Sequence, residues 1–138
     1  KLIWETYLWF YGVLMEFRIV FDSIEAKGTL TLYEAWTKGK GKDKINKQIL
    51  QEEPIASVDY IVTDAVEVTD LKVKEEYRKK GLGRLIMNIV MALANYYDKP
   101  IELTSADDAI PFYKSIGMKL KKGTKDVFIW KPKPKKRL

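Results

Sequence analysis

The sequence predicts one domain of the mixed α+β class. Segments that favour strands fill the first half of the chain, and two helical segments then alternate with shorter strands. The 138 residues, of which 46% are hydrophobic and 12% aromatic, are enough to bury a core. We place the domain at residues 1–131 and a basic tail at 132–138.

The first four predicted strands are rich in β-branched and aromatic residues. They cover residues 15–23, 28–36, 54–63 and 66–73. The apolar run before them is too short to span a membrane, and we expect it to form part of the fold. Its aromatic residues either cover the sheet or form the seam of a homodimer: Trp4, Tyr7, Trp9, Phe10 and Tyr11.

The fourth predicted strand contains an irregularity. Its apolar residues are Val66, Val68, Leu71 and Val73, so the period of two is broken by one step of three. A β-bulge around Thr69-Asp70 would absorb the extra residue, and the alternative is a simple irregularity at a sheet edge. A bulge here would leave backbone groups free just before a glycine-rich turn.

A helix is predicted over 82–97, because apolar residues recur there at the spacing of one helical face. A short strand at 99–105 follows. The apolar stripe of the helix comprises Leu82, Leu85, Ile86, Ile89, Val90, Leu93 and Tyr97.

A second helix is predicted over 107–117, and the chain then ends in a hairpin around Gly123, formed by 118–122 and 125–132. The signals for the helix come from its start and its end: Asp107 or Asp108 near the cap, Pro111 in the first turn and Gly117 at the stop.

Charge and composition exclude several classes of site. Five basic residues and no acid lie in 131–138, so most of the net charge of +6 belongs to the tail. The tail and a basic loop at 37–47 are either solvated or weak tethers for phosphate or a membrane surface. The chain has no cysteine and no histidine, so we expect no metal site and a reducing, cytoplasmic location.

The stretch RKKGLG at 78–83 puts glycines and basic residues at the predicted helix start. The first N–H groups of a helix have no intrahelical partner and attract anions. Gly81 and Gly83 would let a phosphate group approach the backbone closely. It is not a dinucleotide fingerprint, because the third small residue would fall on Ile86. The alternative is a solvated charge run.

Two motifs together resemble the GNAT superfamily of acyl-CoA-dependent N-acetyltransferases. YRKKGLGRLIM matches the R/Q-x-x-G-x-G/A signature and follows a strand that ends in DLKV. ADDAIPFYKSIGMKL resembles the second family motif, so that the resemblance covers about residues 54–131. It implies a mostly antiparallel sheet, splayed between the fourth and fifth strands and flanked by helices.

The resemblance also implies acetyl transfer from acetyl-CoA, as co-substrate, to a primary amine by direct attack in a ternary complex. It implies that pantetheine pairs with the end of the fourth strand and that pyrophosphate rests on the glycine turn. The implied coenzyme-binding residues are Leu71, Lys72 and Val73 for the former, and Arg78, Lys79, Lys80, Gly81, Leu82, Gly83 and Arg84 for the latter.

The resemblance implies two catalytic roles. Glu67 stands where many members keep a catalytic glutamate, and we expect it to take the amine proton through water, with Asp70 as the alternate. The alternative is that either is an exposed strand acid. Tyr113 is the candidate acid for the leaving thiolate, or else a packing residue beside Phe112. Because the reference pKa of tyrosine, about 10, exceeds the roughly 8.5 of a thiol, full proton transfer is uphill.

The sequence departs from the family pattern in one important place. Many members carry two helices between the first two strands, whereas only DSIEAKG separates the two predicted here. The wall of the acceptor site is therefore missing, or it is rebuilt by residues 38–53 and the N-terminal stretch. This leaves two alternatives to an enzyme: a catalytically weak acyl-CoA-binding module, and a nucleic-acid-binding domain that uses the basic segments.

Overall fold

The computed structural model describes the backbone of residues 2–10, 13–34, 53–78 and 81–134. Side chains are described for residues 19–33, 53–78 and 81–134. The basic loop predicted at 37–47 and the last four residues of the tail lie outside these ranges.

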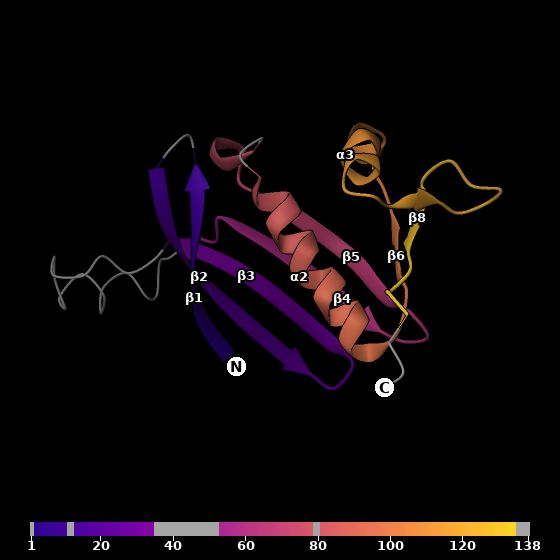
Figure 1. Cartoon of the computed structure of the whole chain (residues 1–138), viewed down its shortest axis with the longest axis horizontal. Helices are drawn as coiled ribbons and strands as arrows, with labels where there is room; N and C mark the ends of the chain where they lie inside the picture. The colour runs from indigo at the N-terminus through magenta and orange to yellow at the C-terminus, as the bar shows by residue number, and fades with distance from the viewer. Residues whose placement is uncertain (1, 11–12, 35–52, 79–80, 135–138) are drawn as a thin grey trace, which may run out of the picture.

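The described residues form one sheet of eight strands in the order β1-β2-β3-β4-β5-β6-β8-β7 (Figure 1). All neighbours are antiparallel except β5 and β6, which are parallel. The strands are β1 Leu2–Phe10, β2 Val13–Ile24, β3 Lys27–Glu34, β4 Ala56–Val62, β5 Val66–Val73, β6 Ile101–Thr104, β7 Lys119–Leu120 and β8 Val127–Trp130.

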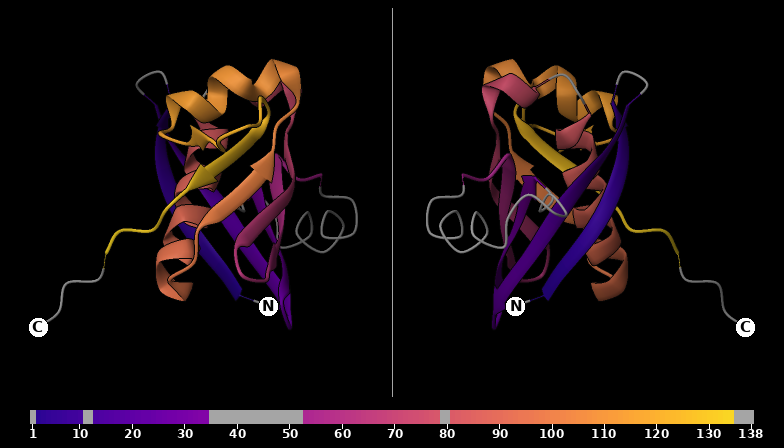
Figure 2. Two further views of the ribbon diagram at one scale, coloured as in Figure 1. Left: turned by 90° about the vertical axis from the view of Figure 1, so that its right-hand side faces the viewer. Right: turned by 90° about the vertical axis from the view of Figure 1, so that its left-hand side faces the viewer.

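Helices cover one face and one end of this sheet (Figures 1 and 2). The long helix α2, Leu82–Tyr97, crosses β4 and β5, and the short helix α3, Ile110–Ser115, lies near the end of β8. Two 3₁₀ turns, η1 Glu75–Tyr77 and η2 Asp107–Ala109, lead into them. Neither α2 nor any other helix in the described ranges has the length and apolar character that crossing a membrane requires.

The prediction of the mixed α+β class is confirmed, and β5 and α2 have the predicted bounds. The prediction of seven strands is wrong, because Leu2–Phe10 forms an eighth, β1, paired with β2 along its whole length. The segment was missed because its apolar residues do not alternate with polar ones. A signal was present in Tyr11-Gly12, a turn-like pair between two apolar runs.

The core lies between α2 and the sheet. The helix buries a row of residues at intervals of four, namely Leu82, Ile86, Val90 and Ala94, together with Met87. The predicted stripe was therefore displaced to one side: it omitted Met87 and Ala94, and it included Tyr97, which is 42% exposed. From the sheet, the fully buried residues include Leu30, Leu32, Val58, Val66, Ile101 and Phe128.

The predicted β-bulge in the fourth strand is confirmed. Asp59 of β4 pairs with Asp70 and Tyr60 pairs with Val68, so Thr69 is the extra residue. The bulge comes directly after the last contact between β5 and β6, which pair only from Val66 to Val68. Beyond it the two strands diverge, as the predicted splay requires.

The second predicted helix is only partly helical. Residues 107–109 form η2, and the α-helix begins at Ile110 with Pro111 in its first turn. Asp107 and Asp108 lie in the turn of η2 and make no capping hydrogen bond, so neither has the predicted capping role. Gly117 follows the helix end with φ of 94°, which favours glycine.

The hairpin of β2 and β3 is closed by a tight turn. Ile24 pairs with Lys27, and the turn residue Glu25 has φ of 55°. Next to this turn, Gly28 lies opposite Tyr60, whose ring covers the space that a side chain would need. A Cβ atom at Gly28 would overlap the hydroxyl oxygen and Cζ of the ring. The tyrosine is buried, and burial, together with the charge of Tyr97, raises its pKa to about 12.

Gly28→Ala should lower the free energy of unfolding by about 1–3 kcal/mol, because the buried Tyr60 ring would have to move. Denaturant unfolding of this variant, of Tyr60→Leu and of the double variant measures the effect. If steric overlap is the cause, the Gly28 substitution costs much less in the Tyr60→Leu background. An equal cost in both backgrounds would contradict it.

Candidate functional site

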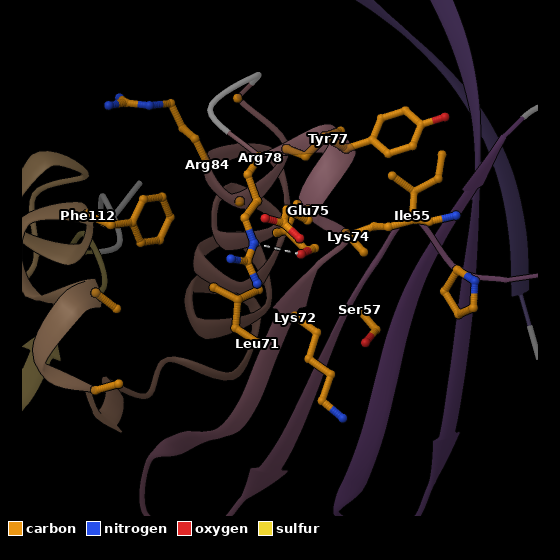
Figure 3. A pocket seen from close by; sticks show the side chains of 18 of the residues that line it. Ile55, Ser57, Leu71, Lys72, Lys74, Glu75, Tyr77, Arg78, Arg84 and Phe112 are labelled. Carbon is orange, nitrogen blue, oxygen red and sulfur yellow. Dashed lines mark hydrogen bonds between the residues drawn. The ribbon is translucent and has the colours of Figure 1, made fainter.

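A cavity of about 1110 Å³ opens where β5 and β6 diverge. Its walls come from the end of β5, the start of α2 and α3, with the start of β4 on the far side (Figure 3). This volume is slightly larger than the roughly 300–1,000 Å³ that is usual for small-molecule sites. Three sets of groups in the cavity point to its chemistry: backbone groups of β5, the helix N-terminus and a buried tyrosine.

The inner edge of β5 presents backbone groups to the cavity that neither β4 nor β6 pairs with. The N–H of Lys74 donates to the carbonyl of Ile55 at 2.8 Å, and this bond fixes the alternation of the β4–β5 ladder. The backbone N–H and C=O groups of Lys72 therefore point toward β4, whereas those of Leu71 and Val73 point away from β4. They face the gap, where β6 no longer pairs with β5. An extended ligand can bind there as a strand would.

The start of α2 presents donors to the same cavity. Gly81 is the N-cap, with φ of 88°, and no side chain among the described residues caps the helix. The first intrahelical bond runs from Leu85 N–H to the Gly81 carbonyl at 3.0 Å. The N–H groups of Leu82, Gly83 and Arg84 precede it and are available to an anion. A Cβ atom at Gly81 would meet nothing within 4 Å, so the approach is open.

Two arginines add positive charge at this end. The Arg78 side chain donates from Nε to the Val73 carbonyl at 3.1 Å, and so folds over the free edge of β5 (Figure 3). The Arg84 side chain reaches α3, where Nη2 lies 3.5 Å from the Ser115 carbonyl oxygen. Within the described ranges neither arginine forms an ion pair, whereas Lys72 pairs with Asp70 at 3.2 Å. The positive charges of both arginines are therefore available to an anionic ligand.

Helix α3 supplies two of the aromatic residues that line the cavity, and the third, Tyr77, comes from η1. Phe112 packs against the α2 start, because a Cβ atom at Gly83 would come within 3.1 Å of its Cζ. Tyr113 is only 7% exposed, and its ring lies 5.1 Å from that of Phe112 and 5.6 Å from that of Phe128. Burial raises the pKa of Tyr113, and the negative charge of Asp70 raises it further. The phenol therefore stays protonated at neutral pH and can donate a hydrogen bond.

The two candidate carboxylates of β5 occupy different positions. Glu67 is exposed and lies in parallel register beside Glu102 of β6. Neither Glu67 nor Asp70 lines the cavity. Asp70 is half-buried just beyond the bulge, close enough to Tyr113 for its charge to act on the phenol. A proton could reach Glu67 from the cavity only through water.

The structure brings most of the predicted coenzyme-binding residues into one cavity. Lys79 and Lys80 lie outside the described residues. Those that line the cavity are Leu71, Lys72, Val73, Arg78, Gly81, Leu82, Gly83 and Arg84, with Tyr113.

Sequence reasoning did not find the wall on the β4 side, formed by Glu53, Pro54, Ile55 and Ser57. It follows only from the register that pairs this segment with the end of β5. No local sequence signal marks it. Among the described residues, no group of three or more acidic residues is arranged to hold a metal ion.

These features suit a long ligand with an anionic group at one end. The anion would lie at the α2 start, an extended arm along Leu71 and Val73, and a reactive group near Tyr113 and Asp70. The arrangement can bind such a ligand, exclude part of its arm from water and donate hydrogen bonds to it.

Comparisons with solved structures agree with this fold. A GNAT-family acetyltransferase from Staphylococcus aureus Mu50 matches with a TM-score of 0.58 and 13% identity, over 78% of this chain and 69% of that one. Tetrahymena GCN5 matches with a TM-score of 0.57 and 12% identity, over 81% and 72%. The anti-CRISPR protein AcrVA5 matches with a TM-score of 0.50 and 20% identity, over 54% and 88%. At these identities the likeness shows the fold alone.

The chain spans 64% of the length of one further matching structure, from Exiguobacterium sp. 255-15. No curated protein sequence matches it. The family profile described as "Acetyltransferase (GNAT) domain" matches residues 30–126, which cover β4 to β7 and the whole cavity. With this match over most of its length, and with the divergent β5–β6 pair and glycine turn described above, the chain belongs to the GNAT acetyltransferase family.

Proposed function

We propose that the protein is an N-acetyltransferase that uses acetyl-CoA and transfers the acetyl group to a primary amine by direct attack in a ternary complex. One observation carries this proposal: a single cavity is lined by the free edge of β5, the glycine turn of α2 and Tyr113. Acetyl-CoA would supply an acetyl group activated as a thioester. The composition without cysteine supports a cytoplasmic location as part of the proposal.

The residues present fit two parts of coenzyme A, the pantetheine arm and the pyrophosphate. Leu71 and Val73 offer backbone N–H and C=O groups to the amides of a pantetheine arm. The N–H groups at the α2 start, with Arg78 and Arg84, fit a pyrophosphate. The Val73 carbonyl already accepts from Arg78 Nε, so a ligand either uses its second lone pair or displaces the arginine.

The amine must lose a proton before it attacks. A lysine-like amine has a pKa of about 10.4, so only on the order of one molecule in a thousand is neutral near pH 7. We propose that Glu67 takes this proton through water, and the alternate is Asp70. The effect of the Asp70 charge on the Tyr113 phenol supports the alternate, whereas the exposure of Glu67 supports access from solvent.

Tyr113 is proposed to act on the leaving thiolate. Its raised pKa makes it a poor proton donor toward a thiolate, whose conjugate acid has a pKa of about 8.5. It can still donate a hydrogen bond that stabilises the developing charge. Other backbone N–H groups freed near the bulge are candidates to stabilise the oxyanion of the tetrahedral intermediate.

A second function is favoured by one observation. The turn of Glu25 and Ala26 joins β2 to β3 directly, where many family members carry two helices that border the acceptor amine. A chain without that wall can bind acyl-CoA as a ligand and turn over slowly or not at all. Binding of acetyl-CoA without acetylation of any member of an amine panel would favour this module over the enzyme.

Acetyl-CoA at about a hundred times its dissociation constant should stabilise the fold by roughly 2.7 kcal/mol, a rise in Tm of several degrees. Arg84→Glu should abolish most of this shift, because it reverses charge at the proposed pyrophosphate site. Lys122→Glu is the control: it makes the same charge change at an exposed position that does not line the cavity. No shift of the wild type at millimolar acetyl-CoA would overturn the proposed site. We avoid Gly81 for this test because its φ of 88° strains any side chain.

Tyr113→Phe should lower kcat by about tenfold or more while KM for acetyl-CoA changes little, because a hydrogen bond to the leaving group acts in the transition state. Since burial raises its pKa above the ordinary value, the phenol keeps its proton at neutral and mildly alkaline pH, so the wild type should show no loss of rate there from tyrosine ionisation. Tyr96→Phe, on the exposed side of α2, is the control. An unchanged kcat in Tyr113→Phe would leave the tyrosine a packing role only.

Glu67→Gln should lower kcat/KM at pH 7 by about a hundredfold, and the defect should shrink above pH 9 as the amine loses its proton unaided. Asp70→Asn is the matched comparison on the same strand. A large, pH-dependent defect in Asp70→Asn with little effect of Glu67→Gln would assign the base to Asp70. Small effects in both variants, measured from pH 6 to 10, would contradict a carboxylate base on β5.

A further inference from the structure

The two edges of the sheet differ in length and composition. The sheet order places β1 at one edge and β7 at the other. Strand β7 has only two residues, Lys119–Leu120, and two more lysines follow it. Strand β1 has nine. Short edge strands and lysines are the usual protection against edge-to-edge pairing, so the β7 edge is protected.

The β1 edge carries none of these protections. Its sequence, LIWETYLWF, contains no proline, glycine or lysine and a single charged residue, Glu5. Its register with β2 runs without a shift from Leu2 opposite Phe21 to Phe10 opposite Val13, so no bulge twists it away. Within the described parts of the chain, no strand pairs with its outer side. A long, regular and mostly apolar edge of this kind favours pairing with another strand.

The sequence of β1 complements itself when two copies run antiparallel. A two-fold axis at Thr6 places Leu2 opposite Phe10, Ile3 opposite Trp9 and Trp4 opposite Leu8, so apolar residues face apolar residues. It also places each Glu5 opposite Tyr7, which keeps the two acids apart. A parallel, in-register pair would instead bring the acids side by side, which is unfavourable. The antiparallel arrangement also closes as a symmetric dimer.

We propose that the protein forms a homodimer in which the β1 strands of two copies pair antiparallel about Thr6, joining both sheets into one. A second copy is the occupant that fits best, because the strand supplies its own complement. The β1 edge is separated from the β5–β6 gap by β2, β3 and β4 (Figure 1), so both cavities stay open in the dimer. The proposal does not depend on acetyl transfer.

Charge substitution at the axis tests the seam. The wild type should sediment as a dimer, and Thr6→Lys should raise the dissociation constant at least tenfold because two lysines would face each other. Thr6→Glu should do the same, whereas an equimolar mixture of the two variants should recover the dimer. Thr104→Lys, on an exposed position of β6, is the control and should leave the wild-type dimer intact. Circular dichroism checks that each variant is folded.

A cysteine probe serves as the second measurement, since it adds no charge. The chain contains no cysteine, so Thr6→Cys introduces a single thiol. Facing residues of an antiparallel pair have Cα atoms about 4.5–5.5 Å apart, which suits a disulfide. Oxidation should link Thr6→Cys into covalent dimers, which a non-reducing denaturing gel detects. Thr104→Cys should run as a monomer on the same gel. A monomeric wild type, a dimer unaffected by Thr6→Lys, or failure of Thr6→Cys to cross-link would each overturn the proposal.

Discussion

The short parallel contact between β5 and β6 is the constraint on which the site depends. The two strands pair only from Val66 to Val68, and the bulge at Thr69 follows at once. Were the pairing to continue, β6 would occupy the backbone groups of Leu71 and Val73, and the cavity would close. The bulge also keeps Leu71 and Val73 on the core side of the strand, where both pack against the buried cluster. One extra residue therefore serves packing and access together.

The helix α2 links this gap to the core of the protein. Its buried residues, from Leu82 to Ala94, hold the helix on the sheet. The first turn of the helix lines the cavity. The N-terminal N–H groups are therefore held by packing rather than by a mobile loop, which reduces the ordering that anion binding would otherwise require. Phe112 adds a second support, because it packs on Gly83 from α3. A Cβ atom at position 83 would require the Phe112 ring to shift.

Sequence patterns gave different amounts of information for different elements. The bounds of β5 and α2 were predictable because each pattern is periodic, and the step of three between Val68 and Leu71 marked the bulge. β1 was not predictable from alternation, because both of its faces carry apolar residue types. The cavity wall at Ile55 could not be predicted, since it arises from pairing between segments whose register no local residue specifies. The position of Gly81 at the helix start was predictable, whereas the contact of the Arg78 side chain with the Val73 carbonyl depends on side-chain geometry.

The tight turn between β2 and β3 also affects how the chain reaches its fold. With that turn in place, strands β1 to β6 occur in the sheet in the same order as in the sequence. In the β1–β2, β2–β3 and β4–β5 pairs, contacting residues are separated by short stretches of chain, and topologies of low contact order fold faster than those with distant pairings. The exception beside the cavity is the crossover from β5 through α2 to β6, whose parallel pairing requires closure of a long segment. The cavity is thus completed by one of the more distant pairings in the fold, while the β1–β2 and β2–β3 hairpins need only local closure.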